Sequence, residues 1–262
     1  MRIIVCAKQV PDTNDVKIDH KHGTLIRDGV PSILNPDDAN GLEAALQIKD
    51  KNPDTKVTIL TMGPAQAGVM IRECMAMGAD DGIILSSRAF AGADTRATSK
   101  TLAVGINHIG GADLIFCGRQ AIDGDTAQVG PQLAARLGIP CVTYVQKIEF
   151  KDEKTLIVQR QLEDGYQVVE VKLPCLLTAV KELNEPRYMT IKGILEAYDK
   201  PLTILDHNDV GMAPEDCGLA ASATQVLTSF TPPPKGKGQM LSGTINEMAA
   251  TVVKSLTEKH VI

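Results

Sequence analysis

Apolar and polar residues along the first 140 positions follow two periods in alternation. Short apolar runs, typical of buried strands, are followed by longer stretches in which apolar residues recur at helical spacing. The predicted strands are Ile3–Ala7, Val57–Thr61, Gly82–Leu85 and Leu114–Cys117, and the predicted helices are Pro36–Lys51, Gly63–Met77, Thr95–His108 and Thr126–Leu137. This repetition predicts an α/β fold, with a mostly parallel sheet and helices on both faces, that is a Rossmann-like nucleotide-binding fold.

A short hairpin is predicted between the first strand and the first helix. Its strands are Val16–Asp19 and Thr24–Ile26, and its polar turn contains His20 and His22. A solvated turn explains these histidines better than a metal site does, and we predict no metal. The first helix then follows Asn35, which we expect to act as its N-cap.

After residue 144 the pattern changes to alternation of apolar and polar residues, which is typical of strands with one solvated face. Polar turns separate these segments, so the pattern predicts an antiparallel extension of the sheet. Its strands are Val145–Phe150, Leu156–Gln161 and Gln167–Val171, followed by a last strand at Cys175–Ala179. From about Lys181 onward we predict no further strand–helix unit.

The C-terminal part of the chain combines a linker with an amphipathic helix. The run from Thr231 to Pro234 cannot form a helix or a central strand. Apolar residues then recur at helical spacing from Ile245 to Leu256 and form one apolar face. This C-terminal arm can pack on the chain's own core or on a partner chain, and periodicity does not distinguish the two.

Composition excludes several classes of protein. The 262 residues carry a net charge of −5 and include four Phe, four Tyr and no Trp, so the basic surface and stacking aromatics that nucleic acids require are missing. Six cysteines without a CxxC spacing argue against disulfides and against zinc or iron–sulfur sites. No apolar run approaches the roughly 20 residues that span a bilayer. The strand that begins at Ile3 leaves no room for a leader peptide, so we expect a cytoplasmic protein.

The predicted ligand site lies at the carboxyl ends of the parallel strands. The most informative end is the stretch 117–130, with the sequence CGRQAIDGDTAQVG. Its glycines let the backbone approach a ligand, and the start of the next helix offers unpaired N–H groups to a phosphate. Asp125 or Thr126 could equally be an ordinary N-cap of that helix.

Several separated motifs resemble one known family. GRQAIDGDTAQVGP at 118–131 is similar to the adenine-nucleotide loop of electron-transfer flavoprotein beta subunits, and VQRQLEDG at 158–165 is similar to the signature of that family. The motifs CAKQVPD at 6–12, Asn35-Pro36 and MGPAQ at 62–66 also fit. The resemblance therefore covers essentially the whole chain.

The resemblance implies an adenine nucleotide over the end of the first strand and the 118–129 loop. Ala7 is small enough for adenine to lie over the backbone, whereas Asp123 and Asp125 suit ribose hydroxyls or hold the loop, because a pyrophosphate would repel them. Ala7 and Met62 could instead be core residues, and Gln128 a solvated one. The residues predicted to bind the adenylate are Ala7, Val10, Pro11, Asn35, Met62, Gly63, Gly118, Arg119, Gln120, Ala121, Ile122, Asp123, Gly124, Asp125, Thr126, Ala127 and Gln128.

The family contains two kinds of beta subunit. Simple members hold AMP, whereas electron-bifurcating members hold a complete FAD in the same groove. The segments 92–99 and 221–226 resemble the bifurcating kind, although both could be capping or turn residues, and Ala223 stands where many such members carry Pro. The residues predicted to bind the flavin half are Asp94, Thr95, Thr98, Ser222, Thr224 and Gln225.

From this resemblance we expect a subunit of a flavin-dependent, NADH-oxidising complex. FAD in this chain would accept a hydride from NADH. One electron would pass through the FAD of an alpha subunit to an acyl-CoA dehydrogenase-type reductase, and the other to ferredoxin or flavodoxin. Because the flavin carries the chemistry, we predict no catalytic side chain. The alternatives are a simple electron-transfer flavoprotein with structural AMP and a free-standing nucleotide-binding regulator of the universal-stress type.

The segment Leu183–Met189 resembles the family's recognition loop, which grips the dehydrogenase partner. Pro186 favours a tight turn, so we expect Arg187 and Tyr188 to project outward as an interface pair, unless they hold the turn together internally. Residues 1–185 are predicted to form the nucleotide-binding domain. Residues 186–262 are predicted to form the recognition loop and the C-terminal arm, packed on the alpha subunit.

Overall fold

The computed structural model describes residues 1–12, 18–19, 24–25, 31–228 and 236–262 of the chain. The chain divides into two compact units, Met1–Thr228 and Ser229–Ile262. The domain boundary that we predict at residue 185, and the packing of the last 77 or so residues on a partner subunit, stay predictions.

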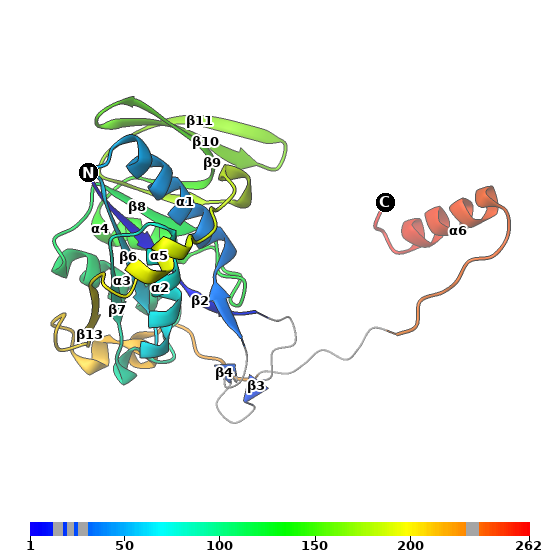
Figure 1. Cartoon of the computed structure of the whole chain (residues 1–262). Helices are drawn as coiled ribbons and strands as arrows, with labels where there is room; N and C mark the ends of the chain where they lie inside the picture. The colour runs from blue at the N-terminus through cyan, green and yellow to red at the C-terminus, as the bar shows by residue number, and fades with distance from the viewer. Residues whose placement is uncertain (13–17, 20–23, 26–30, 229–235) are drawn as a thin grey trace. The chain divides into compact units, whose positions relative to one another are not determined.

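A nine-stranded sheet forms the centre of the first unit (Figure 1). Its order is β11–β10–β9–β12–β8–β1–β6–β7–β13; neighbours from β9 to β13 run parallel, and β9, β10 and β11 are antiparallel. The strands of this sheet are β1 (Arg2–Cys6), β6 (Lys56–Met62), β7 (Asp81–Leu85), β8 (Leu114–Gly118), β9 (Cys141–Asp152), β10 (Thr155–Leu162), β11 (Gly165–Lys172), β12 (Cys175–Ala179) and β13 (Leu202–Leu205). The predicted α/β class, with its mostly parallel sheet and antiparallel extension, is confirmed.

Helices cover both faces of the sheet because the strands are apolar on both faces. Ile3 and Val5 of β1 belong to one core, whereas Ile4 belongs to the other. The first core takes residues of α1 (Pro36–Lys51) and α2 (Gly68–Met77), and the second takes residues of α3 (Thr95–His108) and α4 (Val129–Leu137). The carboxyl ends of β1, β6 and β8 are thereby framed by helices on both sides.

Two predicted helices differ from the observed ones. The helix predicted over 63–77 is divided into η1 (Ala65–Ala67) and α2. The helix predicted from Thr126 begins only at Val129, because Asp125 and Ala127 adopt φ values of 55° and 52°, which no right-handed helix accommodates. The predicted bounds 36–51 and 95–108 are confirmed.

The expectation that no further strand–helix unit follows Lys181 is wrong. Helix α5 (Ile191–Glu196) packs on α2, and β13 extends the sheet beside β7. The sequence pattern misses both elements because their apolar side chains do not follow a buried face. Ile191 and Leu195 of α5 are 82% and 70% exposed, and β13 is a short edge strand.

The remaining elements are short. The antiparallel pair β3–β4 agrees with the predicted hairpin, but residues 16–17, 20–23 and 26 lie outside the described residues, and so do His20 and His22. The linker 231–234 lies outside them as well. These minor elements are β2 (Gln9–Pro11), β3 (Ile18–Asp19), β4 (Thr24–Leu25), β5 (Ser32–Leu34), η2 (Arg88–Phe90), η3 (Lys181–Leu183), η4 (Pro214–Asp216) and η5 (Gly218–Ala221).

The second unit contains α6 (Ile245–Glu258), which confirms the predicted C-terminal helix. A capping box begins it: Thr244 accepts a hydrogen bond from the Glu247 backbone, and Glu247 accepts one from the Thr244 backbone. The apolar face remains solvated within this unit, with Ile245 81% exposed. Within the described parts of both units, no helix is long and apolar enough to cross a membrane.

Candidate functional site

The N-terminus of α1 lies between the carboxyl ends of β1 and β8 and joins them through one carboxylate. Asp38 is buried; its Oδ2 accepts a hydrogen bond from the Lys8 backbone N–H at 2.8 Å, and its Oδ1 accepts one from the Gly118 N–H at 2.7 Å. Position 118 requires glycine, because a Cβ there would lie 2.4 Å from Asp38 Oδ1. Asp38 therefore fixes the start of the loop at residues 118–128, called here the ligand loop.

Burial governs the charge state of this carboxyl group. Loss of hydration raises the pKa of Asp38 to about 7, although hydrogen bonds from Lys8, Gly118 and Asn35 act in the opposite direction. Neighbouring Asp37 is also shifted upward: burial raises its pKa, and the Arg119 guanidinium only partly offsets that effect. Sequence reasoning missed Asp38, because an acidic residue in the first turn of a helix is an ordinary feature.

Asn35 does not cap α1 with its side chain, contrary to our expectation. It occupies the N-cap position without a capping hydrogen bond. Its amide instead donates to the Gln120 carbonyl at 2.9 Å and accepts from the Ile122 N–H at 3.1 Å. Because Asn35 is fully buried, these loop groups replace the water that its amide would lose. Asn35 therefore shapes the ligand loop, and its direct contact with a nucleotide stays a prediction.

We expect Asn35→Ala to lower the free energy of unfolding by about 1–3 kcal/mol, because two buried hydrogen bonds are lost and their loop partners stay desolvated. Nucleotide retention should fall with it. Chemical denaturation and dialysis of the purified chain measure the two effects. Asn52→Ala, at the exposed other end of the same helix, is the matched control and should change neither. An Asn35 variant with unchanged stability would contradict the role given to this amide.

The two acidic residues of the ligand loop are held by partners within the chain. Lys8 Nζ lies 2.5 Å from Asp123 Oδ1, and the Gln120 amide donates to Asp125. Of the two expected roles, ribose binding or holding the loop, these contacts support the second. Arg119 is likewise engaged, because its Nε lies 3.3 Å from Asp37 and its guanidinium 6.0 Å from the Tyr144 ring centroid.

The end of the ligand loop carries unpaired backbone donors. Among the described residues, no acceptor pairs with the N–H groups of Thr126, Ala127 or Gln128. The left-handed Asp125 and Ala127 place these groups just before α4, whose first turn adds its own partial positive charge. Such an arrangement suits a phosphate group, as predicted for this loop. The residues fit an adenine nucleotide on this side of the sheet.

The other predicted adenylate residues line the strand ends around this loop. Ala7, Val10 and Pro11 are buried, and the Ala7 N–H donates to the Leu60 carbonyl. Met62 is partly buried against the second core, and the Gly63 N–H donates to the Leu85 carbonyl. These contacts support the alternative core roles of Ala7 and Met62. Contact of these strand-end residues with a ligand stays a prediction.

The two segments predicted to hold a flavin lie together. Asp94 caps α3 by accepting from the Ala97 N–H, and its other carboxylate oxygen accepts from the Ala223 and Thr224 N–H groups at 2.8 and 3.0 Å. Partial burial raises the pKa of Asp94, but the hydrogen bonds from Ala97, Thr224 and Ala223 outweigh it, and its pKa lies below the ordinary value. Thus the capping and turn roles that we kept open are present.

Several side chains of these segments are already engaged. Ser222 Oγ accepts from the Asp94 N–H at 2.9 Å and donates to the Gly218 carbonyl at 2.8 Å, and the Thr224 hydroxyl bonds Asp94. In contrast, the side chains of Thr98 and Gln225 form no hydrogen bond within the described part of the chain. Thr98 and Gln225 are therefore the residues predicted to bind the flavin half whose side chains have no hydrogen-bond partner among the described residues.

A chain of side-chain hydrogen bonds links the ligand loop to α3. Thr95 Oγ1 donates to the Gln128 amide at 2.9 Å, and Gln132 donates to Thr95 at 3.2 Å. Ser99 then donates to Gln132 at 3.1 Å and accepts from Arg136 at 2.9 Å. Hydrogen-bonded polar side chains thus run from the predicted adenylate residue Gln128 to the predicted flavin residue Thr95 and on across α3 and α4. They are called here the polar surface, although Ser99 among them is buried.

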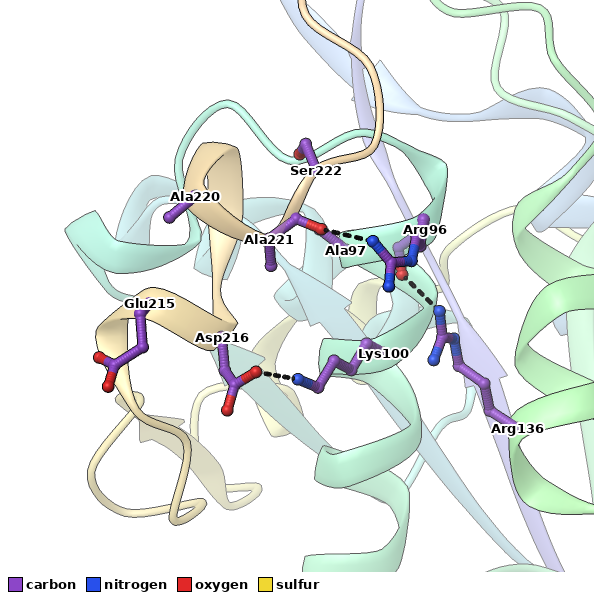
Figure 2. Close-up of a pocket in the computed structure, with 9 residues that line it drawn as sticks. All are labelled: Arg96, Ala97, Lys100, Arg136, Glu215, Asp216, Ala220, Ala221 and Ser222. Atoms are coloured by element: carbon purple, nitrogen blue, oxygen red, sulfur yellow. Dashed lines mark hydrogen bonds and ion pairs between the residues drawn. The ribbon is translucent and has the colours of Figure 1, made fainter.

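An open cavity of about 270 Å³ lies next to these hydrogen-bonded side chains, between α3, α4 and residues 214–222 (Figure 2). Figure 2 shows Lys100 paired with Asp216, at 2.6 Å, and the Arg136 guanidinium directed toward the Arg96 carbonyl. Sequence reasoning missed this cavity because its residues come from three distant segments. Its two acidic side chains, Glu215 and Asp216, partly balance its three basic ones.

Arg187 does not project outward, so the expected interface pair is wrong for this residue. Its guanidinium binds Glu43 of α1, with Nε 2.8 Å from Oε2, and its Nη2 lies 2.6 Å from Asp50. Asn184 and Asn40 exchange hydrogen bonds beside it. The two charged partners lie about two turns apart on α1 and attract Arg187 inward. The alternative of an internal staple is the observed one.

Tyr188 does project outward and is 95% exposed. Ile191, Leu195 and Tyr198 follow it with exposed fractions of 82%, 70% and 73%. Arg72 lies 5.7 Å from the Tyr198 ring centroid and donates to the Lys200 carbonyl at 2.7 Å, which holds this stretch on α2. The segment 188–198, called here the exposed platform, therefore presents apolar side chains to solvent.

Comparisons with known proteins agree with this architecture. The family described as "Electron transfer flavoprotein domain" matches residues 22–210. Over the full length of both chains, the protein is 65% identical to "Caffeyl-CoA reductase-Etf complex subunit CarD" of Acetobacterium woodii and 53% identical to "Electron transfer flavoprotein subunit beta" of Clostridium acetobutylicum. It is 49% identical, again over both whole chains, to "Acryloyl-CoA reductase electron transfer subunit gamma" of Anaerotignum propionicum. The chain belongs to the electron transfer flavoprotein family, and its relatives support a role as a beta-type subunit in electron transfer.

Proposed function

We propose that this chain is the beta subunit of an electron-bifurcating electron transfer flavoprotein and that it binds FAD. The complex would oxidise NADH and divide the two electrons. One electron would pass by way of an alpha subunit to an acyl-CoA dehydrogenase-type reductase, and the other would reduce ferredoxin or flavodoxin.

The observation that carries this proposal is the continuity of the polar surface. The unpaired N–H groups of Thr126, Ala127 and Gln128 suit the pyrophosphate. From there, the contact between Gln128 and Thr95 leads to α3, where the Thr98 hydroxyl is available to a ligand. An adenylate would use only the first part of this surface. The flavin half of FAD would use the second.

When bound, FAD supplies the exchange of electron pairs for single electrons, which no side chain of this protein can perform. The chain's own residues would position it. Asp38 and Asn35 fix the ligand loop, and Asp94 fixes the 222–224 segment beside α3. The side chains that remain for contact with the flavin half are Thr98 and Gln225.

The relatives bear on the identity of the electron acceptors. Two of them are subunits of caffeyl-CoA and acryloyl-CoA reductase complexes. An enoyl-CoA reductase of that chemical class is therefore the high-potential acceptor that we propose. The exposed platform at Tyr188, Ile191 and Leu195 offers an apolar surface to such a protein.

Electron accounting under anaerobic conditions tests the division of electrons. NADH, ferredoxin, the reductase and its enoyl-CoA substrate are mixed with the purified heterodimer. We expect ferredoxin reduction to require the enoyl-CoA, with one NADH consumed for each pair of electrons shared between the two acceptors. Reduction of the enoyl-CoA at full rate without ferredoxin, and with no ferredoxin reduction when it is present, would favour the simple carrier instead.

A further inference from the structure

The protonation state of one buried acidic group, Asp38, has no part in the function proposed above. Asp38 is buried, yet it is held by the backbone N–H groups of Lys8 and Gly118 and by the Asn35 amide rather than by a cation. A carboxylate can accept both N–H bonds at once, one on each oxygen. A protonated carboxyl carries a hydroxyl on one oxygen, and that hydroxyl would face a donor instead of an acceptor. Protonation of Asp38 therefore weakens the Lys8 or the Gly118 hydrogen bond, because a hydroxyl oxygen is a poorer acceptor than a carboxylate oxygen.

We propose that Asp38 is a positioning residue of the cofactor site and that its ionised form is the one that binds the cofactor. This inference rests on the proposed function, because the ligand loop is the part that Asp38 controls. Gly118 begins that loop, and Lys8 reaches Asp123 in its middle with its own ammonium group. Weakening of either backbone bond therefore loosens the ligand loop at its start or near Asp123, although Asn35 still holds Gln120 and Ile122.

The surroundings of Asp38 make it titrate near neutrality. Burial raises its pKa to about 7. Burial also raises the pKa of the Cys74 thiol, and contact with Cys6, together with burial, raises the pKa of the Cys117 thiol, so neither thiol ionises near pH 7. The charged and titratable groups that face Asp38 from the adjoining elements are Asp37, Lys8, Arg119, Asp123, Cys74 and Cys117.

The pH dependence of the free energy of unfolding and that of cofactor affinity have opposite signs, which distinguishes a positioning role of Asp38 from a purely structural one. The pKa of Asp38 in the folded chain lies above that of the unfolded chain, so Asp38 makes the free energy of unfolding decrease as pH rises from about 4 to about 7. Cofactor affinity would change in the opposite direction, since the ionised form holds the loop. For a single proton, the slope cannot exceed about tenfold per pH unit.

FAD is the probe for this test because its pyrophosphate stays fully charged between pH 6 and 8. The full chain, freed of cofactor, is titrated with FAD by calorimetry across this range. We expect the affinity to fall by about tenfold from pH 8 to pH 6. In Asp38→Asn we expect about tenfold weaker binding at pH 8 and no dependence on pH. Asp54→Asn, which removes an exposed acidic group beyond the other end of α1, is the control and should keep the slope of the unmodified protein.

Hydrogen exchange of the unmodified chain gives a second measurement that needs neither a variant nor a ligand. After correction for the intrinsic pH dependence, protection of the Lys8 and Gly118 amides should decline as pH falls below 7. Equal protection at pH 6 and 8, an affinity that rises on acidification, or an Asp38→Asn variant that keeps the original slope would overturn the proposal. If FAD binds at no pH while the amide protection changes as expected, Asp38 keeps its positioning role and the proposed cofactor is wrong.

Discussion

Replacement of Gly118 by alanine is expected to lower the free energy of unfolding by about 3 kcal/mol and to abolish nucleotide retention. The new Cβ would lie 2.4 Å from Asp38 Oδ1 and 2.8 Å from the Asp38 backbone nitrogen. A flexible side chain could move away, but the first turn of α1 cannot do so without loss of the core behind it, so overpacking of this size is costly. Chemical denaturation measures the first effect, and cofactor content after dialysis measures the second.

Gly124→Ala is the matched control, because it lies in the same loop with no atom within 4 Å of its would-be Cβ. We expect its stability to stay within about 0.5 kcal/mol of the original. If both variants behave alike, close packing of Asp38 on Gly118 does not define the loop.

Replacement of Arg187 by alanine is expected to lower the free energy of unfolding by about 2 kcal/mol. Glu43, whose side chain is 5% exposed, would lose the partner that compensates its burial. The effect is smaller than for a fully buried pair, because the Arg187 side chain is 32% exposed and solvent screens part of its attraction. Arg187→Lys should recover only part of the loss, since an ammonium group cannot bind Glu43 and Asp50 in the same forked geometry.

The contact between Arg187 and Asp50 makes the free energy of unfolding depend on pH, with a definite sign. Hydrogen bonding to Arg187 lowers the pKa of Asp50 below its ordinary value. Asp50 therefore contributes stability above its unfolded pKa of about 4, and this contribution is lost as pH falls through the lower folded value. Denaturation curves of Arg187→Ala and the original should thus converge in acid. Lys192→Ala, on the exposed face of α5, is the control, and an equal loss in this variant would mean that the Arg187 staple has no special role.

The sequence predicts the parallel core well because its strands and helices carry strong periodic signals. The helix over 36–51 and the strand over 175–179 have the predicted bounds, since Pro36 marks a helix start and buried strands are continuously apolar. Helix α5 and β13 escape prediction because tertiary packing, rather than periodicity, defines them. Gly193 illustrates this: a Cβ there would lie 2.1 Å from the Ala76 carbonyl oxygen, a contact with α2 that no local pattern reveals.

The candidate site could be located from the sequence, but the roles within it could not. The glycine-bearing loop after β8 marks the site, because loops at strand ends bind ligands in such folds. The partner of a polar side chain depends on segments distant in sequence, however. Asn35 meets Gln120 and Ile122, and Arg187 meets Glu43, only after the chain has folded. For both residues, local reasoning therefore proposed a cap or an outward contact where the structure has a long-range staple.

The cofactor content of the purified heterodimer tests the central claim most directly. The complex of this chain with its alpha subunit is denatured, and the released nucleotides are separated and quantified against the protein. We predict two FAD per heterodimer, one of them held by this chain through the ligand loop and the surface that leads to Thr98. One FAD together with one AMP would contradict the account and would assign the chain to the simple carriers.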